Sequence, residues 1–171
     1  MNWRFEKKTL NALGWIIGIL NSNKINYQIS GGFAGKIFGS QRKLHDIDID
    51  IHEKDFNKIK REVSNYITYG PSRYKDAKWD IELITLSYKG QEIDISGVET
   101  MKISNKRRTK WITFPVDFSN ALNVSLNGLK IKIINPNNFI KYKKELDGIH
   151  QTEDIKMAKN YLVNHAGNLE K

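Results

Sequence analysis

Three aspartates alternate with three isoleucines in residues 46–51, which read DIDIDI. Side chains two positions apart lie on the same face of a β-strand, so Asp46, Asp48 and Asp50 would share one face while the isoleucines enter the core. Two like charges about 5–6 Å apart repel by roughly 3 kcal/mol at an effective dielectric constant of about 20. A divalent cation would offset that repulsion, because Mg²⁺ prefers carboxylate oxygens as ligands. The spacing therefore predicts a metal site on this strand.

The competing interpretation is a solvent-facing strand with aspartates at its polar positions. It is the weaker one, because Asp is a poor strand former and occurs here three times in alternation. Asp50 taken alone is an exception. It lies farthest from the glycines that precede the strand, and we interpret it as a neighbour on the same face rather than as a ligand.

A second acidic segment, QEIDI at 91–95, has the same alternation. Glu92 and Asp94 would share one face, and Asp94 would complete a carboxylate triad if this strand lay beside the first. Such a triad would hold two cations and accept a proton from a hydroxyl group. Asp80 and Glu82 form a rival pair on the preceding strand, and we expect this pair to be exposed.

The sequence Ser30-Gly31-Gly32 joins an expected strand to a short helix and supplies a second kind of chemistry. Backbone N–H groups at a helix N-terminus suit a phosphate, and residues without a Cβ let the backbone approach a ligand closely. A Gly-Gly turn alone is a weak signal. Followed by the Asp-Ile-Asp strand, it predicts a site for a phosphorylated ligand.

The elements that must position these residues follow from hydrophobic periodicity and turn residues. We expect helices at 4–22, 33–38 and 54–66, strands at 25–30, 46–52, 79–87, 91–96, 111–116 and 122–134, the last folded back at Asn127-Gly128, and two C-terminal helices. The first of these would run from Pro136 to Asp147-Gly148, and Thr152 would cap the second, which ends near 164. This order indicates an α+β fold with a mixed sheet. The prediction is one domain over 1–171, with a core at about 25–134 and C-terminal helices at about 136–165.

The composition narrows the class of protein further. Hydrophobic residues make up 39% of the 171 residues, enough for a packed core, and the absence of cysteine excludes disulfides and favours a cytoplasmic protein. The apolar run at 13–20 is too short to span a bilayer, so we expect no membrane segment. A formal net charge of +9 favours anionic partners such as nucleotides or nucleic acid. The basic cluster Lys106-Arg107-Arg108 is interpreted as a solvated loop, with an RNA or phosphate contact as the alternative.

These motifs together resemble the nucleotidyltransferase superfamily that includes DNA polymerase β. Its signature is a Gly-Gly or Gly-Ser turn, a short helix, Asp-x-Asp on the next strand and a third acidic residue on a later strand. Gly31-Gly32, Asp46-Ile47-Asp48 and Asp94 match these parts in order. With Gly39 and Arg42 between them, the string is most similar to the lincosamide and aminoglycoside nucleotidyltransferases and to the stand-alone AbiE-type proteins.

The C-terminal segment from Pro136 to Ile155 is also similar to the helical tail of this group. There a lysine in a Pro-x-x-hydrophobic-hydrophobic-x-Tyr-Lys helix lies near the nucleotide phosphates. The match places Lys143 in that role, with Lys141 and Lys144 as exposed neighbours. Residues 97–134 match no part of the family pattern, so the acceptor side is not predicted.

The resemblance implies a mixed-sheet nucleotidyltransferase core and a metal-dependent enzyme that moves an NMP group from NTP, most simply ATP, to a hydroxyl and releases pyrophosphate. Two Mg²⁺ ions, with Mn²⁺ as the alternative, would be held by Asp46, Asp48 and Asp94. Asp94 would also be the general base. The residues expected to bind the nucleotide phosphates are Ser30, Gly31, Gly32, Arg42 and Lys143.

The acceptor remains open between a small hydroxylated compound, such as an antibiotic, and the tRNA or protein hydroxyl of toxin-type members. A further alternative is a catalytically silent module that binds nucleotide or RNA. The presence of all three carboxylates disfavours that alternative. The sequence does not indicate whether the chain forms oligomers.

Overall fold

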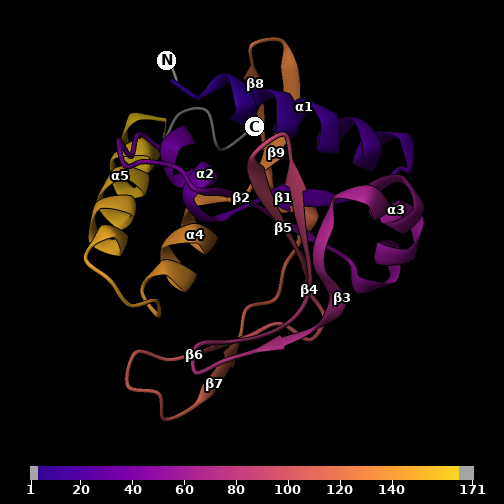
Figure 1. Ribbon diagram of the computed structural model, residues 1–171. Coiled ribbons are helices and arrows are strands. Elements are labelled where there is room, and N and C mark those ends of the chain that lie inside the picture. The colour runs from indigo at the N-terminus through magenta and orange to yellow at the C-terminus, as the bar shows by residue number, and fades with distance from the viewer. Residues whose placement is uncertain (1–3, 166–171) are drawn as a thin grey trace.

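The computed structural model describes residues 4–165, in which helices surround one mixed β-sheet (Figure 1). The strand order is β7-β6-β4-β5-β2-β1-β9-β8, and β3 pairs with β4 off this path. The strands are β1 (Tyr27–Ile29), β2 (Asp46–Ile51), β3 (Ile67–Lys75), β4 (Trp79–Tyr88), β5 (Gln91–Gly97), β6 (Lys102–Ser104), β7 (Trp111–Thr113), β8 (Leu122–Leu126) and β9 (Leu129–Ile133). The helices are α1 (Lys7–Ser22), α2 (Gly31–Ile37), α3 (Phe56–Val63), α4 (Pro136–Lys143) and α5 (His150–Asn164). The predicted α+β class with a mixed sheet is confirmed.

The centre of the sheet places the two acidic strands side by side. Strand β2 pairs in parallel with β5, so that Asp46 lies opposite Glu92 and Asp48 lies opposite Asp94. The intervening isoleucines of both strands are fully buried. The alternation read from the sequence is therefore real: one face of β2 and β5 is apolar core, and the other carries carboxylates.

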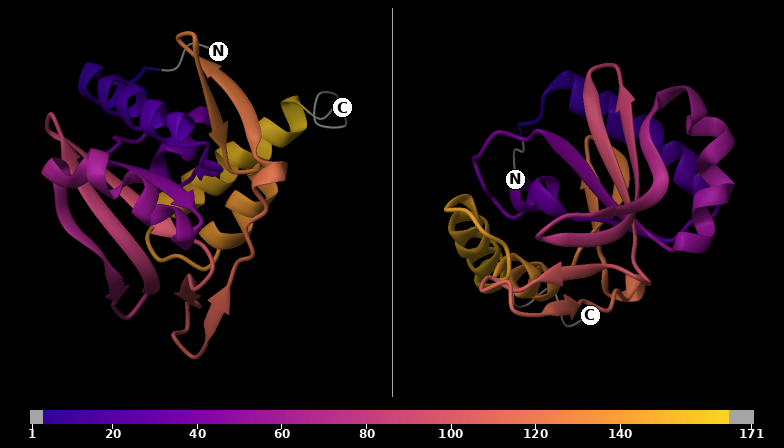
Figure 2. Two further views of the ribbon diagram at one scale, coloured as in Figure 1. Left: turned by 90° about the vertical axis from the view of Figure 1, so that its right-hand side faces the viewer. Right: turned by 60° about the horizontal axis from the view of Figure 1, so that its bottom comes forward.

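Helices cover the core from two sides (Figures 1 and 2). Helix α1 buries Leu13, Ile16, Ile17 and Leu20, and it packs beside α3. Helices α4 and α5 pack against each other, and α2 contacts α5. Strands β6 and β7 lie on the same side of the molecule as α4 and α5 (Figure 2). Residues of the acidic strands, of α4, and of β4 and β6 line one common cavity.

The helix boundaries near the C-terminus differ from the prediction. Helix α4 ends at Lys143 rather than at 147–148, and α5 begins at His150 rather than after Thr152. Gly148, with a φ of +102°, turns the chain, and its carbonyl accepts the N–H of Gln151 at 3.2 Å. Because this turn already starts the helix, a Thr152 cap is not needed.

Two strands were not predicted. Strand β3 contains Gly70-Pro71 and register irregularities against β4, and most of it is exposed, so it lacks a period of two. Strand β6 has only three residues. Both are specified by pairing with β4 rather than by their own sequences.

Among the described helices, none combines the length and the apolar character that a membrane crossing requires.

Candidate active site

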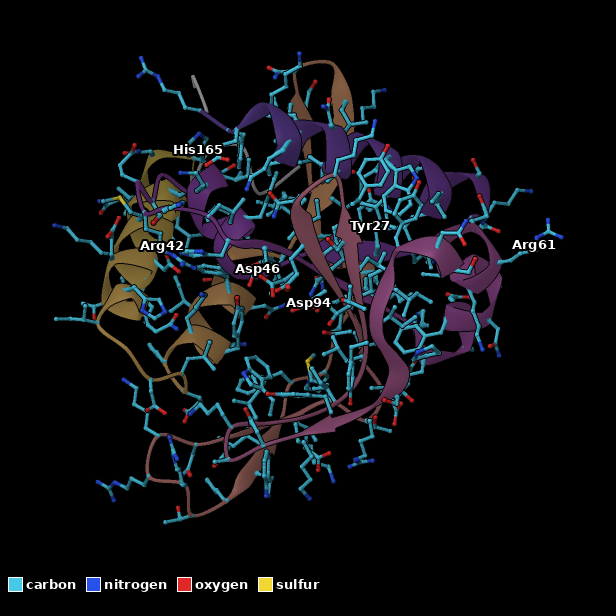
Figure 3. All side chains as sticks on the ribbon, in the orientation of Figure 1. Tyr27, Arg42, Asp46, Arg61, Asp94 and His165 are labelled. Atoms are coloured by element: carbon cyan, nitrogen blue, oxygen red, sulfur yellow. The ribbon has the colours of Figure 1, made fainter. Side chains whose placement is uncertain are left out.

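A cavity of about 740 Å³ lies above the acidic face of β2 and β5. All of the predicted site residues line it: Ser30, Gly31, Gly32, Arg42, Asp46, Asp48, Asp94 and Lys143. Figure 3 shows Asp46 and Asp94 close together at the centre of the molecule, with Arg42 on the side of α5. The structure thus gathers residues from distant parts of the sequence around one space.

Three carboxylates lie close enough to share a metal ion. Asp46, Glu92 and Asp94 each offer an oxygen, and these oxygens all lie within 4.8 Å of one another. Two of the three were predicted as ligands. Glu92 was recognised only as sharing a face with Asp94, and its place in the cluster depends on the β2–β5 register. A group built only from carboxylates is typical of a site for a hard divalent cation such as Mg²⁺ or Mn²⁺.

Asp48 lies next to this cluster and against the glycine turn. Burial, together with the charges of Asp46 and Asp94, raises the pKa of its carboxyl to about 7. A Cβ placed on Gly31 would lie 1.5 Å from Asp48 Oδ2, and Gly31 has a φ of +54°. Only glycine meets both conditions at this position. The carboxylates repel one another as expected, and a bound cation would relieve that repulsion.

Asp50 is not the exposed neighbour that the sequence suggested. It is 6% exposed and accepts a hydrogen bond from Gln28 Nε2 at 2.8 Å. The Ser30 hydroxyl lies 3.4 Å from its Oδ1. Burial raises the pKa of the Asp50 carboxyl to about 6. Asp50 therefore supports the end of β1 and holds the Ser30 side chain that precedes the glycine turn.

A hydrogen bond to a side chain of α4 holds the start of α2 in place. The backbone N–H of Gly31 donates to the hydroxyl of Tyr142 at 3.0 Å, and Tyr142 is buried. This contact was not predicted, because nothing in either segment indicates the other. It means that α4 sets the position of the glycine turn relative to Asp48.

Two basic side chains that line the cavity pair with the same carboxylate. Lys143 Nζ lies 3.0 Å from Asp154 Oδ2, and Arg42 Nε lies 3.2 Å from Asp154 Oδ1. Lys143 is 2% exposed and Asp154 is fully buried. Burial lowers the pKa of the Lys143 ammonium, whereas the Asp154 carboxylate acts to raise it. Lys141 and Lys144 are exposed, as expected.

Asp94 has a dedicated donor. The Thr85 hydroxyl on β4 donates to Asp94 Oδ1 at 2.7 Å. Burial raises the pKa of the Asp94 carboxyl, and the Thr85 bond partly opposes that rise. A carboxyl with a raised pKa that is held in one orientation is suited to proton transfer.

The rival acidic pair on β4 does not reach the cavity. Asp80 is 4% exposed, contrary to the expectation of an exposed pair. Its carboxylate accepts from Arg73 Nε at 2.6 Å and lies 3.4 Å from Lys75 Nζ. These contacts from β3 hold the pKa of Asp80 below its usual range. Asp80 thus joins β3 to β4 and is paired away from the site.

The fold and the site together indicate a class of protein. An open mixed sheet that presents carboxylates from two parallel neighbouring strands, beside a glycine turn and a short helix, is the arrangement of the nucleotidyltransferase superfamily. Residues 12–158 match the aminoglycoside-2''-adenylyltransferase family. The chain belongs to that family and is a nucleotidyltransferase. A sequence search of curated proteins gives no significant match.

Solved structures share the fold at low sequence identity. A provisionally assigned nucleotidyltransferase from Thermotoga maritima is 21% identical, with a TM-score of 0.68, and the match covers 94% of this chain and 96% of that one. The lincomycin-bound lincosamide adenylyltransferase LnuA is 18% identical, with a TM-score of 0.59 and coverages of 94% and 99%. ANT(2'')-Ia in complex with adenylyl-2''-tobramycin is 11% identical, with a TM-score of 0.60 and coverages of 94% and 94%.

Proposed function

We propose that this enzyme transfers the NMP group of an NTP, with ATP as the expected nucleotide, to a hydroxyl of a small molecule and releases pyrophosphate. The observation that carries the proposal is one cavity holding a carboxylate cluster on β2 and β5 together with Arg42 and Lys143. Carboxylates suit divalent cations, and the two basic side chains suit phosphates. The structural neighbours bound to lincomycin and to adenylyl-2''-tobramycin support a small-molecule acceptor.

The metal ligands in this proposal are Asp46, Asp48 and Asp94, with Glu92 as an additional carboxylate within reach. Two Mg²⁺ ions are expected, and Mn²⁺ is the alternative. When bound, the cations would activate the attacking hydroxyl and neutralise charge on the triphosphate. Burial and, after it, repulsion from Asp46 and Asp94 raise the pKa of Asp48, which supports this assignment because cations fit a site whose carboxylates resist ionising together.

The chain's own residues would act on the proton and the phosphates. Asp94 accepts the proton of the acceptor hydroxyl while the acceptor oxygen forms a bond to the α-phosphorus. The bond between the α-phosphorus and the bridging oxygen to the β-phosphate breaks, and pyrophosphate leaves. Arg42 and Lys143 attract the β- and γ-phosphates, and the turn at Ser30, Gly31 and Gly32 lets them approach the backbone.

The size of the cavity favours a small acceptor over tRNA. About 740 Å³ lies within the range of roughly 300–1,000 Å³ typical of small-molecule sites. The basic cluster that was considered for RNA is exposed, and its Arg108 pairs with Asp147 at 3.6 Å. A tRNA acceptor therefore has no specific support from the described residues.

The test is Mg²⁺-dependent pyrophosphate release from ATP with small hydroxylated compounds, total tRNA and protein extract as acceptors. We expect release with a small compound, and a loss of at least about a hundredfold in Asp48→Asn and Asp94→Asn. Asp117→Asn is the matched control, because Asp117 is exposed and does not line the cavity. Full activity in both site variants would contradict the mechanism.

A further inference from the structure

On the side of β4 and β6, the cavity has an apolar wall. Strand β4 presents alternate residues to the cavity, namely Trp79, Ile81 and Leu83, whereas Asp80 and Glu82 point to the other face. Ile81 is 7% exposed and Leu83 is 8% exposed. Met101, Ile103 and Phe114 continue this wall from β6 and the segment after β7.

The charged side chains that line the cavity all lie elsewhere. Within the part of the chain that the structure describes, they belong to β2 and β5, to α4, to the segment 42–45 and to the first residue of α5. Tyr69 and Tyr74 of β3 add aromatic surface and hydroxyl groups. A ligand that enters this side would therefore meet apolar and aromatic surface.

The apolar wall leads directly to the reacting group. Thr85 is the next cavity-facing residue of β4 after Leu83, and it holds Asp94 at 2.7 Å. Residues two apart on a strand are separated by about 6.6–6.8 Å, so Trp79 lies three such steps, or roughly 20 Å, from Thr85. A molecule with its hydroxyl at Asp94 would extend its body along Leu83, Ile81 and Trp79.

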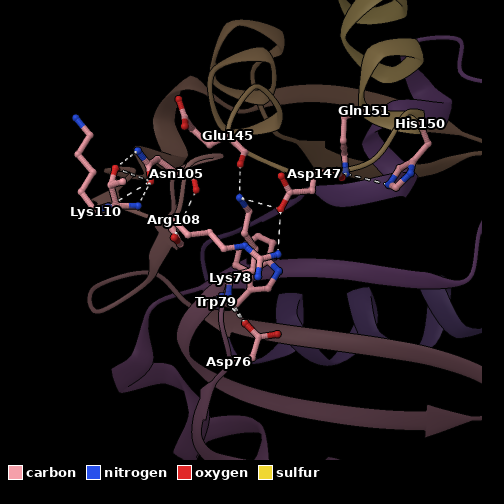
Figure 4. A network of polar contacts seen from close by, with 12 residues as sticks. Asp76, Lys78, Trp79, Asn105, Arg108, Lys110, Glu145, Asp147, His150 and Gln151 are labelled. Carbon is pink, nitrogen blue, oxygen red and sulfur yellow. Dashed lines mark hydrogen bonds and ion pairs between the residues drawn. The ribbon is translucent and has the colours of Figure 1, made fainter.

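A polar network holds the outer end of this wall in place (Figure 4). Asp76 accepts the backbone N–H groups of Lys78 and Trp79, each at 2.6 Å. Lys78 Nζ donates to the carbonyl of Glu145 and lies 3.6 Å from Asp147 Oδ2, which also lies 3.6 Å from Arg108 Nη2. The Asp147 carboxylate, which does not line the cavity, is thus shared between Lys78 and Arg108.

We propose that the acceptor is a hydroxylated molecule with an extended apolar or aromatic face, and that this side of the cavity is not a site for a polycation. The inference rests on the proposed transfer to a hydroxyl. Burying an ammonium group without a partner is unfavourable, whereas burying apolar surface against apolar surface is favourable. The acceptor chemistry of this chain therefore differs from that of a binder of aminoglycosides, which carry several amino groups.

The test compares ligands that differ only in the apolar part. Octyl β-D-glucoside below its micelle concentration and methyl β-D-glucoside share their hydroxyls, and tobramycin provides the polycation. Binding is measured by calorimetry on the full chain with Mg²⁺ and a non-hydrolysable ATP analogue present. We expect the octyl compound to bind at least about tenfold more tightly than the methyl compound, and tobramycin not to displace it.

Substitutions on β4 test where octyl glucoside binds. Trp79→Ala and Leu83→Ala should each weaken octyl glucoside binding by roughly tenfold and leave the affinity for the nucleotide analogue unchanged. Trp111→Ala is the matched control, since Trp111 is 40% exposed and does not line the cavity. The ligand comparison on the unaltered chain needs no variant, so it decides the matter even if a substitution impairs folding.

The outcomes separate this inference from the proposed function. Equal affinity for the two glucosides, displacement by tobramycin, or unchanged binding in a folded Trp79→Ala protein would overturn the apolar acceptor site. Failure of the nucleotide analogue to bind with Mg²⁺ would instead contradict the proposed transfer, and the glucoside comparison would still report on the wall by itself.

Discussion

At the scale of single residues, Asp154 connects two cations that come from separate parts of the chain. Its carboxylate lies fully buried between Arg42 and Lys143, and Gly35 leaves room for it, since a Cβ there would lie 2.9 Å from Asp154 Oδ1. Asp154 itself is not among the residues that line the cavity. We interpret it as a positioning residue that keeps both cations directed at the phosphates.

Replacing Asp154 by Asn tests this role. The buried Lys143 ammonium would lose its partner, so the free energy of unfolding should fall by about 3–5 kcal/mol and the affinity for ATP should fall with it. The same change at Asp147, which is 50% exposed and pairs at 3.6 Å, should change stability by less than about 1 kcal/mol. Urea denaturation of the two variants gives the comparison. Equal stabilities would contradict the role assigned to Asp154.

Asp50 predicts a pH dependence of stability in metal-free protein. Its folded-state pKa of about 6 lies above the ordinary value of 3.8, so between these pH values the folded state binds more protons than the unfolded state. The contribution of Asp50 to stability therefore falls as pH rises through this window, by up to roughly 3 kcal/mol. Asp50→Asn should remove this part of the slope in denaturation curves recorded with EDTA between about pH 4 and 7. An unchanged slope would show that the Asp50 carboxyl ionises normally.

At the scale of elements, the turn into α2 depends on Gly31 having no side chain. In Gly31→Ala the new Cβ would collide with Asp48, and the positive φ adds about 1–2 kcal/mol of backbone strain. We expect transfer activity to fall by at least about a hundredfold. Gly18→Ala is the matched control, because Gly18 is exposed in α1 with nothing within 4 Å of a Cβ, and it should raise stability by up to about 1 kcal/mol. Activity near the unaltered level in Gly31→Ala would refute the close approach.

The elements that could be predicted from the sequence are those with a local pattern. The alternation in 46–51 and 91–95 identified both acidic strands and their core faces, because a period of two is set by the strand itself. Strand β3 was missed, because Gly70-Pro71 interrupts its pattern and its partner β4 determines its course. The turn at Gly148 likewise moved the start of α5 away from Thr152.

The parts of the site that the sequence did not reveal depend on contacts between distant segments. Arg42 and Asp154 are 112 positions apart, and Tyr142 meets Gly31 across 111. No local pattern encodes such pairs. The apolar wall was hidden for the same reason, because it forms only when β6 and the segment after β7 come beside β4.

At the scale of the whole molecule, the cavity joins both halves of the chain, so ligands should stabilise the fold as a unit. We expect Mg²⁺ and a non-hydrolysable ATP analogue to bind only the folded state. At a hundredfold excess over the dissociation constant they should raise the free energy of unfolding by about 2.7 kcal/mol. Thermal unfolding should show a larger shift with both ligands than the sum of the shifts with each. No shift with both ligands present would contradict nucleotide binding at this site.

Nucleotidyl transfer is measured most directly by following two labels of ATP in the presence of Mg²⁺ and a small hydroxylated acceptor. Nucleotidyl transfer predicts that label from the α-phosphate appears on the acceptor and that label from the γ-phosphate leaves in pyrophosphate, with both products reduced at least about a hundredfold in Asp94→Asn. Transfer of the γ-label to the acceptor would contradict nucleotidyl transfer. Transfer of the α-label that persists unchanged in Asp94→Asn would contradict the role of Asp94 as the general base.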